Sequence, residues 1–141
     1  MTIPRTVRSW QPLLGVALLL ASCDFPFFSD EEPPPELARV VINGTSPVLL
    51  ELLTSTAFQP VTDPETGTTS ISFVAATIDT IDVPFENEYA LAPNDRFYVR
   101  LTNPDTATAS VQMQVFFDGV KMYDNTRDLE DGSMEFSWIY F

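Results

Sequence analysis

The 141-residue chain contains no histidine and a single cysteine, Cys23. Without histidine it lacks the usual general base, the Ser-His-Asp arrangement and the commonest zinc ligand. One cysteine cannot form an internal disulfide, so packing alone must hold the folded part together. The sequence also has no G-x-S-x-G elbow, P-loop, H-E-x-x-H or C-x-x-C motif. These absences predict a protein that is not an enzyme and that holds no cofactor.

Basic residues are also scarce, with seven against 20 acidic residues and a net charge of −13. All the acidic residues follow Cys23, whereas Arg5 and Arg8 precede it. A chain cut before Cys23 would carry about −15, from 20 acidic and 5 basic residues. Nucleic acids and anionic lipid headgroups repel a surface of this charge. We therefore expect no nucleic-acid partner.

The N-terminal segment has the pattern of a secretory signal peptide. Arg5 and Arg8 form a positive n-region, and an apolar core follows over 12–20. Two small residues, Ala21 and Ser22, come next. The apolar core is too short to span a membrane, so the pattern predicts a signal peptide over 1–22 that is removed on export.

The last four residues of this segment, Leu20-Ala21-Ser22-Cys23, resemble the bacterial lipobox. In lipoproteins the peptide is cut before the cysteine, which then carries two or three acyl chains. The resemblance implies that Cys23 is a lipid-attachment site that anchors the chain to a membrane of the cell envelope. Asp24 resembles an inner-membrane retention signal of enterobacterial lipoproteins, but acidic residues at this place accompany surface export in other Gram-negative groups. The periplasmic face of the inner or outer membrane and the cell surface therefore all remain open.

Residues 23–36 are rich in proline and acidic residues and have no apolar periodicity. This composition predicts an extended tether between the lipid and the folded domain. Its aromatic residues Phe25, Phe27 and Phe28 leave two alternatives open. They enter the membrane interface, or they pack on the base of the domain.

From residue 37 onward the pattern is that of β-strands separated by turns. Asp118-Gly119 joins two alternating segments and is the clearest hairpin signal. The expected strands cover 37–43, 47–54 with a continuation over 57–61 after a bend, 71–79, 80–85, 88–91, 97–102, 111–117, 120–123 and 134–141. They predict that 37–141 form an antiparallel, immunoglobulin-like β-sandwich of about seven to nine short strands.

A partial resemblance covers roughly residues 38–125. It comprises Val83-Pro84-Phe85, the stretches 89–95 and 97–103, and the hairpin 115–121. The order of these segments is similar to small β-sandwich envelope proteins of the mycobacterial membrane small-protein (MmpS) type. This resemblance implies the sandwich fold and a role as an accessory to envelope transporters. The chain departs from that family in its lipobox, which replaces a transmembrane helix, and in its acidic surface.

Two groups of residues are candidates for binding. Tyr98, Phe116 and Tyr123 fall opposite the more apolar faces of their strands, so they would form a partner or ligand surface if one sheet exposed all three. Alternating aromatic residues at the C-terminus (Phe136, Trp138 and Tyr140, with Phe116) fit either a sugar-stacking platform or the core.

The second group lies in an expected loop over 124–133. Asp124, Asp128, Glu130 and Asp131 offer hard oxygen ligands, the kind that Ca²⁺ prefers. Their spacing differs from the EF-hand pattern, and Arg127 would pair with one carboxylate. A plain polar loop is the alternative, and we expect no metal site.

The sequence thus predicts a non-enzymatic, lipid-anchored envelope protein that binds another envelope protein or assists a transporter. Two alternatives stay open: a surface lipoprotein that binds carbohydrate or another polymer, and a structural subunit of a surface assembly. The sequence leaves the oligomeric state open as well.

Overall fold

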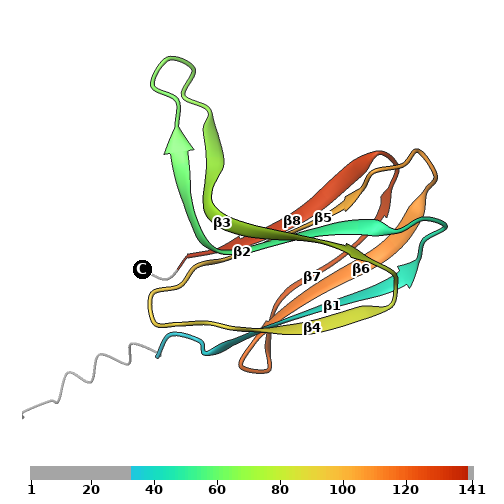
Figure 1. Cartoon of the computed structure of the whole chain (residues 1–141), viewed down its shortest axis with the longest axis horizontal. Coiled ribbons are helices and arrows are strands. Elements are labelled where there is room, and N and C mark those ends of the chain that lie inside the picture. The colour runs from blue at the N-terminus through green and yellow to red at the C-terminus, as the bar shows by residue number, and fades with distance from the viewer. Residues whose placement is uncertain (1–32, 140–141) are drawn as a thin grey trace, which may run out of the picture. The chain divides into compact units, whose positions relative to one another are not determined.

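The computed structural model describes residues 33–139. The predicted signal peptide, the lipid-attachment residue Cys23 and most of the predicted tether lie outside the described residues. The described part contains eight antiparallel strands in two four-stranded sheets that pack face to face (Figure 1). The strands are β1 (Leu37–Thr45), β2 (Leu50–Thr62), β3 (Thr69–Ile81), β4 (Phe85–Ala90), β5 (Phe97–Asn103), β6 (Ala109–Phe117), β7 (Val120–Leu129) and β8 (Gly132–Trp138).

The strand order is β4-β1-β6-β7 in one sheet and β3-β2-β5-β8 in the other. This arrangement confirms the predicted antiparallel β-sandwich, whereas the narrower immunoglobulin-like label stays a prediction. The last strand, β8, pairs along its length with β5 of the same chain. In the part of the chain that the structure describes, no helix is long and apolar enough to cross a membrane.

The core lies between the sheets and follows the predicted alternation. Val40, Leu52, Val99 and Val115 are completely buried, one from each of the four inner strands. Burial of each such side chain contributes roughly 1.5–3 kcal/mol relative to exposure. Trp138 closes one end of this core, with its ring centroid 4.9 Å from that of Phe117.

The Asp118-Gly119 turn has the predicted hairpin geometry, with positive φ angles of 47° and 84°. It has a second role that the sequence pattern does not indicate. The Asp118 carboxylate accepts hydrogen bonds from the backbone N–H groups of Glu36 and Leu37, at 3.1 Å and 3.0 Å. The turn therefore fixes the point at which the chain enters β1.

Two sequence-based strand boundaries were wrong. The expected break between 79 and 80 does not exist, because β3 pairs with β2 continuously there, with Asp79 opposite Leu52 and Thr80 opposite Glu51. The expected loop over 124–133 is mostly strand, because β7 pairs with β6 as far as Leu129. Strand β7 lies at the edge of its sheet, where its polar side chains are exposed to water. Its sequence is therefore as polar as that of a loop, although its backbone forms a strand.

Candidate functional site

The most distinctive feature of the molecule is a long hairpin that leaves the sandwich. Strand β5 pairs with β2 only from Glu51 to Ser55, so the rest of the β2–β3 ribbon continues without that neighbour. Figure 1 shows this ribbon turning sharply away from its sheet and ending in a free loop. We call residues 57–74 the arm: 57–62 of β2, 69–74 of β3, and the turn between them.

The bend at the base of the arm has a specific cause. The pairing of β2 with β3 shifts twice, between Thr54 and Ala57 and again between Ala57 and Phe58. Such bulges bend a strand and raise its twist. The Ser55 hydroxyl donates to the Ala75 carbonyl at 2.5 Å and accepts from the Ala57 N–H at 3.2 Å. This side chain therefore joins the two strands at the place where their regular ladder is interrupted.

A second set of contacts supports the arm from the side. The Arg96 guanidinium donates to the Phe58 carbonyl at 2.8 Å, and the Arg96 N–H donates to the Thr56 carbonyl at 3.2 Å. Both acceptors belong to β2 at and just beyond the bend. The start of β5 is thereby tied to the base of the arm, which gives the arm a defined direction.

The underside of the arm packs on the outer face of its own sheet. Tyr98 is 2% exposed, and its ring lies 5.7 Å from Phe58 and 5.0 Å from Phe73, both from the arm. Leu53 completes the buried part of this small cluster, and Ile139 packs against it. Aromatic pairs of this geometry contribute about 0.5–1.5 kcal/mol beyond the area they bury. The arm is thus a supported element and not a free loop.

The four edge strands differ in how they are protected. Strands β4, β7 and β8 each carry charged side chains, among them Glu86, Lys121 and Glu135. By contrast, residues 66–78 contain no charge, and β3 contains no proline. A long, uncharged edge is a template for pairing with another strand. The opposite edge of the arm contains Pro60, which has no N–H to donate.

Exposed apolar side chains also gather along β3. Val74 is 79% exposed and Ile78 is 64% exposed. Beside the turn between β6 and β7, Val120 is also 64% exposed, next to a hollow of about 560 Å³ that Pro33 and Trp138 help to line. The arm region and this hollow are therefore two apolar surfaces of the described residues that a partner could contact.

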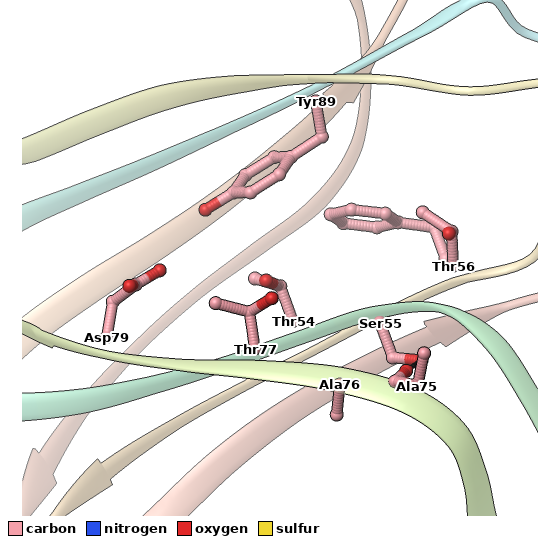
Figure 2. Close-up of a pocket in the computed structure, with 9 residues that line it drawn as sticks. Thr54, Ser55, Thr56, Ala75, Ala76, Thr77, Asp79 and Tyr89 are labelled. Carbon is pink, nitrogen blue, oxygen red and sulfur yellow. Dashed lines mark hydrogen bonds between the residues drawn. The ribbon is translucent and has the colours of Figure 1, made fainter.

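A smaller, more polar cavity of about 250 Å³ opens between the edge strands β3 and β4. Figure 2 shows the Tyr89 hydroxyl directed toward the side of the cavity where Asp79, Thr54 and Thr77 lie. The Tyr89 oxygen is buried and has no hydrogen-bond partner within residues 33–139. Burial raises the pKa of Tyr89, and the negative charge of Asp79 adds to this shift.

The predicted Tyr98, Phe116 and Tyr123 surface is not formed. Tyr98 lies in β5 of one sheet and is buried under the arm, whereas Phe116 and Tyr123 belong to the other sheet. Phe116 lies under the Arg39 guanidinium at 4.5 Å, and Tyr123 packs on the main core beside Phe136. These residues therefore serve three separate structural contacts.

The predicted acidic loop does not gather its carboxylates either. Asp124 and Asp128 belong to β7, whereas Glu130 and Asp131 form the turn to β8. Among residues 33–139, no group of three or more acidic, cysteine or histidine side chains is arranged to hold a metal ion. Hydrogen bonds from Lys121, Gln114 and Gln112 lower the pKa of Asp124 to about 2. Asp124 is thus part of a surface hydrogen-bond network.

The sequence pattern does not identify the arm as a functional element. Its residues 57–61 were expected to continue β2 after a bend, and they do. One sequence feature could have pointed to the arm: residues 66–78 carry no charge, although the chain as a whole is strongly acidic. Comparisons with protein-family models, with curated proteins and with solved structures give no match for this chain.

Proposed function

We propose that this chain is a lipid-anchored protein of the cell envelope, without enzymatic activity, that binds another protein through its arm. The lipobox resemblance at Cys23 supports the anchor. The single observation that carries the binding role is the arm itself, which leaves the sandwich, is held at its base, and exposes uncharged strand edges and apolar side chains.

The arm suits protein binding better than it suits carbohydrate binding. An added strand would use the open backbone groups of β3 for affinity and side chains such as Val74 for specificity. The aromatic residues considered for a sugar platform do not line up on the surface, since Phe136 and Trp138 pack against the main core. Tyr140 lies outside the described residues.

A transport-accessory role remains within this proposal, because the MmpS-type resemblance implies it. A structural role is the second candidate. The uncharged edge of β3 favours it, since an edge of this kind accepts a strand from any chain with matching chemistry, including an identical one.

The test is an affinity pulldown of the native chain from cross-linked membranes. Val74→Glu places a charge on the exposed part of the arm region, and Val120→Glu places the same charge on an exposed valine of β7. We expect Val74→Glu to lose the partner protein and Val120→Glu to retain it. Cys23→Ala reports whether recovery needs the membrane anchor.

Other outcomes of this pulldown contradict the proposal. Loss of the partner with Val120→Glu alone would move the binding surface to the apolar hollow beside the turn between β6 and β7. Recovery of cell-wall polymer without any protein would favour the polymer-binding alternative.

A further inference from the structure

We infer that the β3 edge of the arm, residues 69–74, pairs in an antiparallel manner with the same edge of a second copy of this chain. This inference rests on the proposed function, because it takes the arm as the protein-binding element, and it specifies the partner. The pairing would join the two-stranded arms of both copies into one four-stranded sheet.

The two edges of the arm are not equivalent. Pro60 in β2 interrupts the row of N–H donors on one side. The other side is Thr69-Ser70-Ile71-Ser72-Phe73-Val74, which has no proline, glycine or charge. Six-residue segments of high β-propensity and low charge are those that pair most readily with identical segments. The asymmetry selects the β3 side as the pairing edge.

An added strand would also stabilise the arm, because the arm has only two strands. A two-stranded ribbon is marginally stable in water, and three or more strands with an apolar face are needed for independent stability. Here Phe58 and Phe73 rest on Tyr98 at the base of the arm, but residues 59–62 and 69–70 are exposed. Pairing with a second arm would supply the missing neighbours along the exposed part.

The distribution of charge favours contact between two copies at the arm. Each chain has a net charge of −13, so the two bodies repel one another over most of their surfaces. Within the arm, the charged residues are Asp63 and Glu65 in the turn at its tip. In an antiparallel pair the two tips lie at opposite ends, so these carboxylates do not oppose their own counterparts.

Symmetry fixes how the residues would face each other. An antiparallel pair of identical strands has its two-fold axis perpendicular to the sheet, so one residue lies opposite itself. With the axis at Ile71, Ser70 lies opposite Ser72 of the second copy. With the axis at Ser72, that residue lies opposite itself. Ser70 and Ser72 are both exposed on one face of the arm.

This geometry allows a charge-exchange test on the full-length chain in detergent, with mass measured by sedimentation velocity. We expect the wild type to form a dimer. The double variant S70K/S72K opposes lysines in either register and should weaken dimerisation about tenfold or more, as should S70E/S72E. An equimolar mixture of the two variants should recover the dimer. The control S110K/T126K places two lysines on exposed positions of β6 and β7 and should dimerise like the wild type.

Two results would overturn the inference. One is a wild type that stays monomeric at tens of micromolar, and the other is a set of arm variants that dimerise as the wild type does. If another envelope protein is still recovered in an arm-dependent way, the proposed function stands and only the identity of the partner is wrong. If Val74→Glu has no effect on any recovered protein, the proposed function fails as well.

Discussion

The Tyr98 hydroxyl donates a hydrogen bond to the Glu135 carboxylate at 2.5 Å. The two residues lie on neighbouring strands, β5 and β8, with Tyr98 opposite Ser137 and Glu135 opposite Arg100. The ring of Tyr98 is covered by the arm, while Glu135 is exposed. The Tyr98 side chain therefore supports the arm through its ring and contacts the edge strand β8 through its hydroxyl.

This bond predicts a loss of stability at high pH. Burial, together with the hydrogen bond and the negative charge of Glu135, raises the pKa of Tyr98 from 10.0 to about 12. The folded state thus keeps a proton that the unfolded state loses, so the free energy of unfolding falls as pH rises from 10.0 toward about 12. Denaturant unfolding measured at intervals through this range should show the decline.

Tyr98→Phe should remove part of that pH dependence. At neutral pH the substitution should cost about 0.5–1.5 kcal/mol, because Glu135 can return to water when the hydroxyl is lost. Tyr123→Phe serves as the control for removal of a tyrosine hydroxyl elsewhere in the sandwich. An unchanged alkaline slope in Tyr98→Phe would show that Tyr98 does not retain its proton in the folded state.

The burial of Tyr98 also marks the limit of prediction from this sequence. Alternation placed Val99 and Leu101 on one face of β5 and Tyr98 on the other, and both assignments agree with the structure. Alternation assigns faces but does not say what covers them. Tyr98 is buried because Phe58 and Phe73, distant in sequence, fold over it after a bend. The expectation of an exposed aromatic surface failed for that reason.

The bend itself depends on a detail that periodicity does not encode. The sequence suggested a bend between 54 and 57, but the direction of the arm is set by the two register shifts and by Ser55. Strand β7 shows the converse problem. Its polar side chains are compatible with a loop, and only the pairing with β6 makes it a strand. The local turn residues Asp118-Gly119 predicted the observed hairpin geometry more directly than the apolar periodicity predicted the strands.

Ser55→Ala should loosen the arm. It removes the hydrogen bond to the Ala75 carbonyl and leaves the Ala57 N–H without its acceptor at the bend. The expected loss is about 1–3 kcal/mol. Hydrogen exchange should accelerate for the amides of Gln59 and Ser72, which face each other across the arm just beyond the bend, while the amides of β6 keep their protection. Ser110→Ala, at an exposed position of β6, is the matched control, and equal acceleration throughout the sandwich would contradict a local role for Ser55.

Asp118→Ala should release the start of β1. The carboxylate holds the Glu36 and Leu37 N–H groups, and its residue adopts a φ of 47°. Alanine therefore loses the hydrogen bonds and also adds the cost of a left-handed backbone, about 1–2 kcal/mol. Asp131→Ala carries the same backbone cost, at a φ of 45°. The difference in free energy of unfolding between the two variants should isolate the hydrogen bonds, and equal values would show that they contribute nothing.

Gly44→Ala should be the most damaging glycine-to-alanine substitution among residues 33–139. A Cβ atom at Gly44 would lie 2.1 Å from the Ser110 carbonyl oxygen and 2.9 Å from the Val111 Cα, and the φ of 130° already disfavours a side chain. Both obstructing atoms are backbone of the paired strand β6, so no rotamer change relieves the clash and β1 must move away from β6. We expect a loss of about 3 kcal/mol or more, measured by thermal unfolding.

Gly67→Ala at the tip of the arm is the control that separates the backbone strain from the clash, because its φ of 68° is strained but nothing lies within 4 Å of the added atom. It should cost only about 1–2 kcal/mol, and a similar loss in both variants would mean that the β1–β6 pair absorbs the extra methyl group.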